Sequence, residues 1–339
     1  MIPLNVLDEL SEIGRTAEPV IREYVLRGAS AEFREVLTHQ LDAGGKMLRP
    51  ALVMLACEAA GGSRHQALKA AAAMELVHNY SLIFDDIIDR GEIRRGKPTT
   101  RRVFGDSMAL LAALHYREAI AQVVNDSPQS TALHGLVSKA IENLVEGERM
   151  DILYEQAGRE EEYVKRARMR EPSWETYERI VIHKTASLMG ACAEAGALIA
   201  GASDKVRKGL GDYARLAGEA FQIADDTLDI FGEETKLGKK VGKDIAEHKL
   251  GNAAILLALN ELDADGKANL LSILRKEHVS QEDLSQAIEL MRSTGCRDKA
   301  LKVAAERVEL AKRALHVLPD SDAKARLIVL AESFVSRQF

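Results

Sequence analysis

The sequence predicts a single all-α domain over residues 1–339, and three observations support that prediction. Hydrophobic residues make up 46% of the chain, with Ala and Leu recurring throughout, as in proteins built from long helices. Alternating stretches of β-branched residues are almost absent, so strands are not expected. The chain holds 7 prolines and has no linker, low-complexity block or fixed-period repeat, so nothing marks a domain boundary.

In the first half, apolar residues at helical spacing predict the helices, and glycines and prolines mark where they end. We expect helices over 5–27, 31–42, from Pro50 to about Ala60, and over 64–90, 102–124 and 129–157. Pro50 suits the first turn of its helix. Residues 91–99 form a loop that is punctuated by Gly and Pro and carries three cations.

The second half is also predicted to be helical, with an interruption near its start. Residues 158–172 are charged and poorly periodic, so we expect an exposed excursion there. Helices are expected from Trp174 past Lys184, over 186–200 and 204–231, and in four or so segments of 252–337. Residues 186–200 are almost all small or apolar, as in a fully buried helix.

The two long helices that span 64–90 and 204–231 end alike, with three acids in an apolar run followed by a basic loop. The acids are Asp85, Asp86 and Asp89, here called the first aspartate cluster, and Asp225, Asp226 and Asp229, the second aspartate cluster. On a helix, positions i and i+4 share a face and i+1 lies nearby, so each cluster presents its oxygens together.

Composition and charge exclude several classes of function. The net charge is −6, from 46 basic and 52 acidic residues, which argues against general nucleic-acid binding. The chain start has no basic segment followed by an apolar one, so no signal peptide is expected, and no apolar run is long enough for a transmembrane span. Three widely spaced cysteines are expected to be small buried hydrophobes in a reducing cytoplasm.

The six carboxylates of the two clusters would repel one another if they shared one site, so cations must join them there. The chain offers no Cys and His set for Zn²⁺, whereas oxygen-only ligands suit Mg²⁺, whose shell is often completed by phosphate. Candidate cations near the clusters are Lys46, Arg49, Arg94, Arg95, Lys184, Lys239 and Lys249. Mg²⁺ with Arg and Lys is a common means of binding and activating diphosphates. Because the same helices are apolar, the pattern favours an amphiphile with a diphosphate head.

Each feature alone has a more ordinary explanation. A lone Asp-Asp-x-x-Asp is usually a solvated helix face, and Arg94-Arg95, Lys239 or Lys249 alone would be surface charge. His78 alone is more often a packing residue. Glu75-Leu76-Val77-His78 is half of a di-iron bundle motif, but the chain has no second Glu-x-x-His. The paired clusters and the order of the cations favour the diphosphate site.

Together these motifs resemble those of the trans-isoprenyl diphosphate synthases (polyprenyl synthetases), most closely the archaeal-type geranylgeranyl diphosphate synthases. The resemblance is clearest over residues 40–260. Its pieces are Gly44-Gly45-Lys46-x-x-Arg49-Pro50; Glu75-Leu76-x-His78-x-x-Ser81-Leu82-x-x-Asp85-Asp86-x-x-Asp89; Arg94-Arg95-Gly96-Lys97-Pro98-Thr99; Lys184-Thr185; Phe221-Gln222-x-x-Asp225-Asp226-x-x-Asp229; and Gly238-Lys239.

The resemblance implies an isoprenoid synthase fold, a single bundle of antiparallel helices around a central cavity, and a homodimer. It implies about three Mg²⁺ ions held by the six aspartates, with Asp85, Asp89 and Asp225 as the main ligands. The residues implied to grip the allylic diphosphate are Arg94, Lys184 and Lys239, with Lys249 as a weaker assignment. The residues implied to hold isopentenyl diphosphate are Lys46, Arg49, His78 and Arg95.

The implied reaction is ionisation, condensation and elimination between isopentenyl diphosphate and dimethylallyl, geranyl or farnesyl diphosphate. Thr185 and Gln222 would face the developing allylic cation, and preorganised charge on the leaving group would lower the barrier. A closed apolar cavity would keep water from the cation.

Product length is implied by the helix that precedes the first aspartate cluster. Tyr80 lies five residues before Asp85 and Val77 eight before, about one and two turns deep. Similar enzymes use a bulky residue at the first of these positions as a floor, and Ser81 beside it is small. The pattern resembles that of a C20 synthase, with a C25 or somewhat longer product as the alternative.

The chain also departs from the family pattern. Members often have Gly-Asp where this chain has Ala113-Leu114, a change that removes an acid from a central helix and is expected to reshape the cavity. Phe84 replaces a common histidine, and Gly251 lies where many members have threonine.

Two other functions compete with chain elongation. A terpene cyclase on the same kind of bundle would explain the first aspartate cluster but not the second, nor Lys46 and Arg49. A non-catalytic subunit of a heteromeric synthase would be expected to lose its aspartates, and this chain keeps both clusters.

Overall fold

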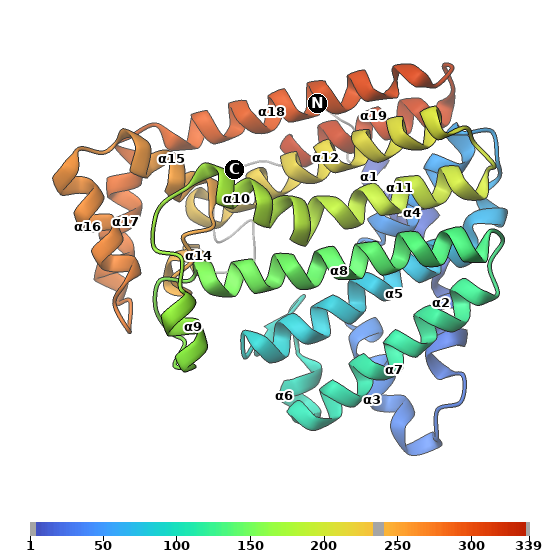
Figure 1. Ribbon diagram of the computed structural model, residues 1–339, viewed down its shortest axis with the longest axis horizontal. Coiled ribbons are helices and arrows are strands. Elements are labelled where there is room, and N and C mark those ends of the chain that lie inside the picture. Colours follow the sequence, from blue (N-terminus) through green and yellow to red (C-terminus); the bar gives the residue numbers. More distant parts are fainter. Residues whose placement is uncertain (1–4, 233–240, 337–339) are drawn as a thin grey trace. The chain divides into compact units, whose positions relative to one another are not determined.

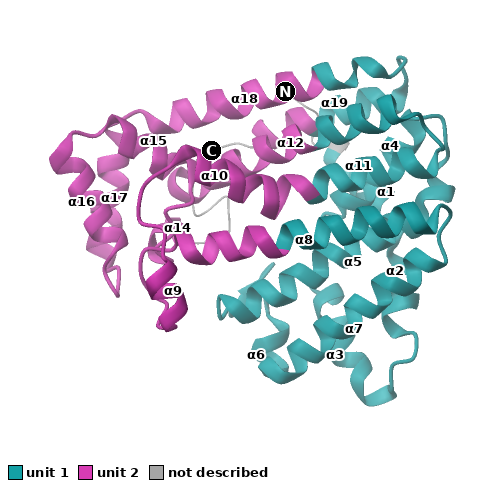
Figure 2. Cartoon of the chain, viewed as in Figure 1, with its two compact units in different colours: residues 1–144, 188–214, 313–330 teal, residues 145–187, 215–312, 331–339 magenta. Residues whose placement is uncertain are grey.

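The computed structural model describes residues 5–232 and 241–336, which are helical apart from loops and one short hairpin (Figure 1). The all-α prediction is therefore confirmed. By their internal contacts the residues form two compact units (Figure 2), each made of separate stretches of sequence. Unit 1 comprises 1–144, 188–214 and 313–330, and unit 2 comprises 145–187, 215–312 and 331–339. The single domain over 1–339 stays a prediction.

The first 129 residues belong to unit 1. Their elements are α1 (Asn5–Arg15), α2 (Glu18–Leu26), the 3₁₀ turn η1 (Ala31–Phe33), α3 (Arg34–Asp42), α4 (Leu48–Ala59), α5 (Arg64–Ile88), β1 (Ile93–Arg94), β2 (Lys97–Pro98), α6 (Thr100–Phe104) and α7 (Asp106–Asn125). Helix α5 packs against α4 and α7, and its central alanines, Ala70 to Ala73, are fully buried. Alanine side chains let neighbouring helices approach α5 closely.

The remaining helices supply unit 2 and complete unit 1. They are α8 (Ser130–Tyr154), α9 (Glu162–Ala167), α10 (Trp174–Val181), the π-helical turn η2 (Ile182–Ala186), α11 (Ser187–Ile199), α12 (Asp204–Phe231), α14 (Lys243–Ala246), α15 (Ala253–Glu261), α16 (Ala264–Leu274), α17 (Gln281–Arg292), α18 (Cys296–Ala314), the 3₁₀ turn η3 (Leu315–Val317) and α19 (Asp322–Val335). Helices α8, α11, α12, α18 and α19 contribute residues to both units, α11 through Ser187 alone.

The helices that end in the aspartate clusters lie where the sequence predicted them. At the start of α5, the backbone N–H of Ser63 donates to Oε1 of Gln66 at 3.0 Å, which satisfies one end group. The helix ends with Asp89 as its C-cap. Helix α12 runs for 28 residues to Phe231 and so contains the whole second aspartate cluster.

Three details differ from the sequence-based expectations. The helix predicted over 5–27 is two helices, because Pro19 favours the first turn of a new helix, α2, and disrupts a continuous one. Gly105, at φ 83°, likewise separates α6 from α7. Although no strands were expected, β1 and β2 pair as an antiparallel hairpin. Its turn residues, Arg95 and Gly96, have φ of 54° and 75°, as hairpin turns require.

Candidate functional site

The first aspartate cluster lies at the C-terminal end of α5 in unit 1. Asp86 is only 4% exposed and is held by Arg94, whose Nε lies 3.0 Å from both carboxylate oxygens and whose Nη2 lies 2.9 Å from Oδ1. Gly91 permits this arrangement, because a Cβ there would lie 2.7 Å from Oδ1 of Asp86. Asp85 and Asp89 are less buried. The chain thus compensates the charge of Asp86 and presents the other two acids one helical turn apart.

Three of the residues predicted to bind isopentenyl diphosphate, Arg49, His78 and Arg95, lie close enough together to interact electrostatically. Burial lowers the pKa of Arg49, although Glu75 opposes the effect, and within the described residues its Nε is buried without a hydrogen-bond partner. Burial also lowers the pKa of His78 well below its usual value, and nearby Arg49, Arg95 and Arg94 lower it further. The imidazole is therefore neutral. A buried guanidinium N–H without a partner and a neutral ring among cations are groups that an anion would satisfy.

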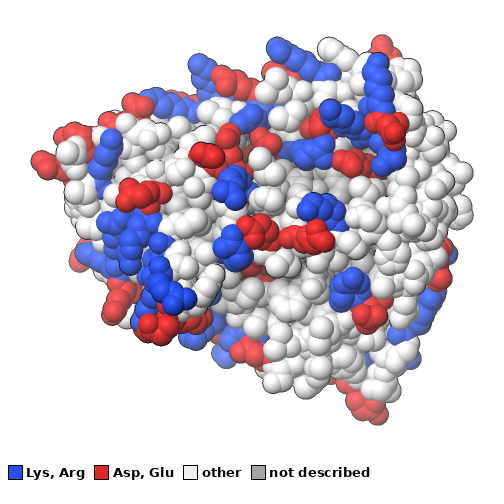
Figure 3. All heavy atoms as spheres, in the orientation of Figure 1, with Lys and Arg blue, Asp and Glu red and all other residues white. Residues whose placement is uncertain are grey.

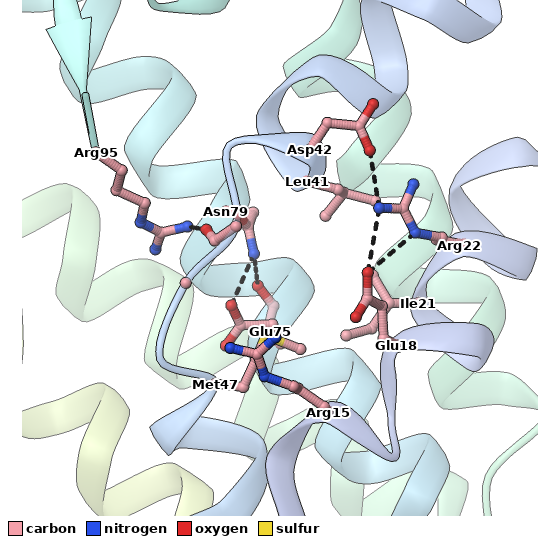
Figure 4. Close-up of a pocket in the computed structure, with 12 residues that line it drawn as sticks. Arg15, Glu18, Ile21, Arg22, Leu41, Asp42, Met47, Glu75, Asn79 and Arg95 are labelled. Carbon is pink, nitrogen blue, oxygen red and sulfur yellow. Dashed lines mark hydrogen bonds and ion pairs between the residues drawn. The ribbon is translucent and has the colours of Figure 1, made fainter. Parts of the chain in front are cut away.

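A cavity of about 220 Å³ in unit 1 adjoins Arg95 (Figure 4). Its residues come from α1, α2, α3, α5, the loop before α4, and the hairpin: Arg15, Glu18, Ile21, Arg22, Leu41, Asp42, Gly44, Gly45, Met47, Glu75, Asn79 and Arg95. Nδ2 of Asn79 donates to Oε1 of the buried Glu75 at 3.0 Å. Arg95 donates to the carbonyl of Gly44 and packs over Gly45, where a Cβ would lie 2.8 Å from its Nη1. Glycine at 45 thus lets the guanidinium lie against the loop.

The residues predicted to limit product length lie on α5, between the buried core and the aspartates. The Tyr80 ring meets that of Phe84 edge to face, with centroids 5.0 Å apart. Val77 is fully buried, and the Ser81 hydroxyl donates to the carbonyl of His78 at 2.8 Å. The two rings form one aromatic pair directly before Asp85, so Phe84 belongs with Tyr80. In the sequence, only their spacing of four residues suggests that Tyr80 and Phe84 pair.

The second aspartate cluster, in unit 2, is held differently. Asp226 is 3% exposed, and its Oδ2 accepts from the Tyr177 hydroxyl at 2.7 Å and from the backbone N–H of Ala253 at 3.0 Å. Burial and the neighbouring Asp244 raise the pKa of Asp226. Asp229 is buried as well, and its Oδ2 accepts from the backbone N–H of Asp244 at 3.0 Å. Neutral donors from α10 and from the start of α15 thus hold Asp226.

Thr185 and Gln222 form a hydrogen-bonded pair, as expected for residues that act together. The Thr185 hydroxyl donates to Oε1 of Gln222 at 2.8 Å, and Nε2 of Gln222 donates to Oδ1 of Asp226 at 2.8 Å. Since Thr185 directs its proton to Gln222, its oxygen lone pairs remain available on the other side. Thr185 lies in the π-helical turn η2, and such turns often occur at functional sites.

Two of the predicted diphosphate-binding lysines meet in a cavity of about 150 Å³ in unit 2. Nζ of Lys184 lies 2.6 Å from Oδ2 of Asp151 and 2.6 Å from Oε2 of Glu148. Nζ of Lys249 lies 3.5 Å from the same Oδ2 of Asp151. The cavity is also lined by Ile180, Val181, Thr185, Gln222, Asp226, Asp244 and Gly251.

Some functional neighbours were missed, and one predicted residue cannot be placed. Lys239 lies outside the described residues. Asp151, Glu148 and Tyr177 were not predicted, because each is a single polar residue in a helical stretch with no repeated motif around it. Two acids spaced i and i+3 on α8, Glu148 and Asp151, were the available signal.

Comparison with known proteins places this chain in a family. The polyprenyl synthetase family model matches residues 30–291. A short chain isoprenyl diphosphate synthase of Methanothermobacter thermautotrophicus is 35% identical over 338 residues, covering 99% of each chain. A geranylgeranyl diphosphate synthase of Methanosarcina mazei is 33% identical over 343 residues, covering 100% of each. The crystal structure of a geranylgeranyl pyrophosphate synthetase from Pyrococcus horikoshii superposes with a TM-score of 0.87 at 32% identity, covering 98% of this chain and 99% of that one.

The chain belongs to the polyprenyl synthetase family. The family and the enzyme class, a trans-prenyltransferase, are thus confirmed. The matched stretch contains both aspartate clusters. None of the described helices has the length and apolarity needed to cross a membrane.

Polyprenyl synthetases work with a divalent metal, and the residues present fit one. The clusters offer carboxylate oxygens, the ligands that hard divalent cations prefer. Within residues 5–232 and 241–336, no three His, Cys, Asp or Glu side chains gather as a ready metal site.

Proposed function

We propose that this chain is a short-chain prenyl-elongating enzyme that condenses isopentenyl diphosphate with allylic diphosphates, giving mainly the C20 product geranylgeranyl diphosphate. The observation that carries the proposal is membership of the polyprenyl synthetase family along nearly the whole chain, with both aspartate clusters retained. A cyclase or a non-catalytic subunit would not need both clusters together with Lys46 and Arg49.

Mg²⁺ is the metal we propose, at about three ions per site, held by the two clusters and supplying Lewis-acid stabilisation of the departing diphosphate. Asp85, Asp89 and Asp225 are the proposed main ligands. Asp86 and Asp226 have a supporting role, since Arg94 holds one and Tyr177 the other. That the two clusters share one set of metal ions is part of the proposal.

The chain's own residues divide the remaining tasks. Lys184, Lys249 and Arg94 would neutralise the allylic diphosphate, as would Lys239. Arg49, His78, Arg95 and Lys46 would hold isopentenyl diphosphate. Thr185 would direct its oxygen lone pairs towards the allylic cation, because its proton is engaged by Gln222. Fixed dipoles of this kind need no reorganisation as charge develops.

The decisive experiment is incorporation of labelled isopentenyl diphosphate with dimethylallyl, geranyl and farnesyl primers, followed by chromatography of the products. We expect turnover that depends on Mg²⁺ and a main product of C20. A main product of C25 would support the longer-chain alternative. A cyclic hydrocarbon, or no incorporation without a second protein, would reject elongation by this chain alone.

We also propose that the chain forms a homodimer through an apolar face of unit 1. Large hydrophobic side chains lie exposed on α6 and α7: Val103, Met108, Leu110, Leu111 and Leu114. Figure 3 shows a mostly uncharged area in the lower middle of this face, although α6 itself carries the exposed Arg102, which pairs with Glu92 at 3.0 Å. A groove of about 450 Å³ adjoins this face between α7 and the loop after α2. Leu114 is 58% exposed and adds to this surface, whereas its neighbour Ala113 is fully buried, so an effect of this pair on the cavity stays a prediction.

Solution mass tests this dimer. Leu114→Asp would place a charge in the apolar face and is expected to shift the protein from dimer to monomer by light scattering. Leu310→Asp on α18, also an exposed leucine, serves as the control and should remain a dimer. Equal masses for the two variants would place the dimer contact elsewhere.

The three free, buried cysteines suit the reducing cytoplasm that we propose as the location.

A further inference from the structure

Two lysines from different segments of unit 2 converge on one carboxylate oxygen. Nζ of Lys184 and Nζ of Lys249 lie 2.6 and 3.5 Å from Oδ2 of Asp151. The two lysines are 65 positions apart in the sequence, and Asp151 lies on a third segment, α8. The side chain of Asp151 is 10% exposed, so water competes little for these contacts.

The backbone around these three residues is fixed by close packing. Gly147, one turn before Asp151 on α8, lies against the π-helical turn, and a Cβ there would lie 2.6 Å from the backbone nitrogen of Lys184. Lys249 forms an isolated antiparallel bridge with Glu155, one turn after Asp151. Asp151 therefore sits between two contacts that anchor the lysine-bearing segments to α8.

Electrostatics keep Asp151 charged despite its burial. Burial by itself raises the pKa of a carboxyl, but Lys184 and Lys249 outweigh it, so the pKa of Asp151 lies well below its usual range. Glu148 adds a second carboxylate on Lys184, at 2.6 Å. The two ammonium groups are thus already paired with acids of the chain at the place where the proposed function requires them to bind phosphate oxygens.

We propose that Asp151 is a positioning residue that competes with the diphosphate for these two lysines. Without diphosphate, Asp151 holds both ammonium groups around a single oxygen, close enough together to span a diphosphate. When the diphosphate leaves, the ammonium groups pair with Asp151 again. The consequence is weaker retention of the inorganic diphosphate product and faster turnover. This inference rests on the proposed role of Lys184 and Lys249 in binding the allylic diphosphate.

The proposal makes a prediction of opposite sign to that of a purely structural residue. Asp151→Asn keeps the shape of the side chain but removes its charge, so both lysines gain free capacity for phosphate. We expect inorganic pyrophosphate with Mg²⁺ to bind Asp151→Asn more tightly by about tenfold in calorimetry, equivalent to 1.4 kcal/mol. Under turnover, kcat should fall and product inhibition by pyrophosphate should strengthen. A residue that only supports the fold would weaken pyrophosphate binding when altered.

Glu219→Gln is the matched control, because it also removes a mostly buried carboxylate of unit 2, one that pairs with Arg307 at 3.1 Å rather than with the lysines. It should leave pyrophosphate affinity and kcat unchanged. If Asp151→Asn does not fold, Glu148→Gln must tighten pyrophosphate binding in the same direction, by a smaller factor. Unchanged or weaker binding in the folded variant overturns the proposal.

The binding assay separates this inference from the proposed function. Calorimetry with pyrophosphate reports on Asp151 whether or not the wild-type chain incorporates isopentenyl diphosphate. A chain that elongates normally but shows weaker pyrophosphate binding in Asp151→Asn would sink only this inference. Failure of wild-type incorporation with tighter binding in the variant would sink only the proposed reaction.

Discussion

The two aspartate clusters share one motif, but the second acid of each is held in a different way. In both, the second acid is almost fully buried and bonded to the protein. Asp86 is held by a cation, Arg94, from the hairpin that follows its helix. Asp226 is held by neutral donors, the Tyr177 hydroxyl and a backbone N–H at the start of α15.

The difference matters because Arg94 balances the charge of Asp86, whereas the donors around Asp226 connect helices. Arg94 can exchange Asp86 for a phosphate, because both are anions that suit a guanidinium. The donors around Asp226 are parts of α10 and α15, so that acid also joins helices, and burial together with Asp244 raises its pKa. A repeated sequence motif therefore does not imply repeated electrostatics, since the partners come from elsewhere in the chain.

The largest effect is expected from removing the first acid of either cluster, because we propose both as main metal ligands. Asp85→Ala and Asp225→Ala should each lower kcat by about a thousandfold, at the upper end of the cost of losing one electrostatic stabiliser. Steady-state incorporation of labelled isopentenyl diphosphate measures this, with circular dichroism to verify the fold. If neither variant is slower than wild type, the shared metal mechanism is wrong.

A smaller effect on stability should distinguish the second acids. Asp226→Ala leaves the Tyr177 hydroxyl and the Ala253 N–H without a partner, which should cost about 2 kcal/mol of unfolding free energy. Asp86→Ala should cost less than about 1 kcal/mol, because Arg94 is partly exposed and can turn to water. Urea denaturation of the two variants measures the difference. Equal losses would mean that the two acids are anchored alike.

Product length should depend on the first of the two helices alone. Tyr80 lies five residues before the first aspartate cluster, whereas the residue five before the second is Ala220. We expect Tyr80→Ala to lengthen the main product by at least one isoprene unit, measured by chromatography. Ser81→Ala, beside it, removes only a hydroxyl bonded to the helix backbone and is the control. An unaltered product ladder in Tyr80→Ala would reject the floor model.

The smallest effect concerns the pH dependence of stability. The folded pKa of His78 lies well below its unfolded value of about 6.5, since burial and three arginines disfavour the charged ring. The stability that this neutral ring contributes is present above about pH 6.5 and is lost as the pH falls towards the folded pKa. Between about pH 6.5 and 5.5 the loss should approach at most about 1.4 kcal/mol.

His78→Gln should therefore lose less stability on acidification than wild type, as measured by thermal melts. His248 in unit 2 also has a lowered pKa, mainly through burial, so His248→Asn should show a change of the same sign but smaller. The exposed His65, replaced by Gln, is the control. A steeper acid loss in His78→Gln would contradict a neutral His78.

Helices with a repeating apolar pattern were predicted correctly from the sequence, whereas contacts made by single side chains were missed. Helices α5 and α12 were placed to within two residues, because long apolar periodicity and capping residues determine them locally. The pairing of Arg94 with Asp86 was missed, since it depends on a turn at Arg95 and Gly96 that no strand-like pattern announced. Tyr177 was missed because its partner, Asp226, is 49 residues away. Periodicity reports which face of a helix is buried, and not which side chain it meets.

His248 illustrates how two distant positions depend on each other. Its backbone has φ 62°, in the left-handed region that favours glycine. Its imidazole lies against Gly158, where a Cβ would lie 2.9 Å from Cδ2 of His248. The backbone N–H of Gln156 donates to the carbonyl of His248 at 2.9 Å. Any substitution of Gly158 would meet the His248 ring, and its own φ of 83° disfavours a side chain as well. The loop after α8 and the turn before α15 therefore depend on one glycine.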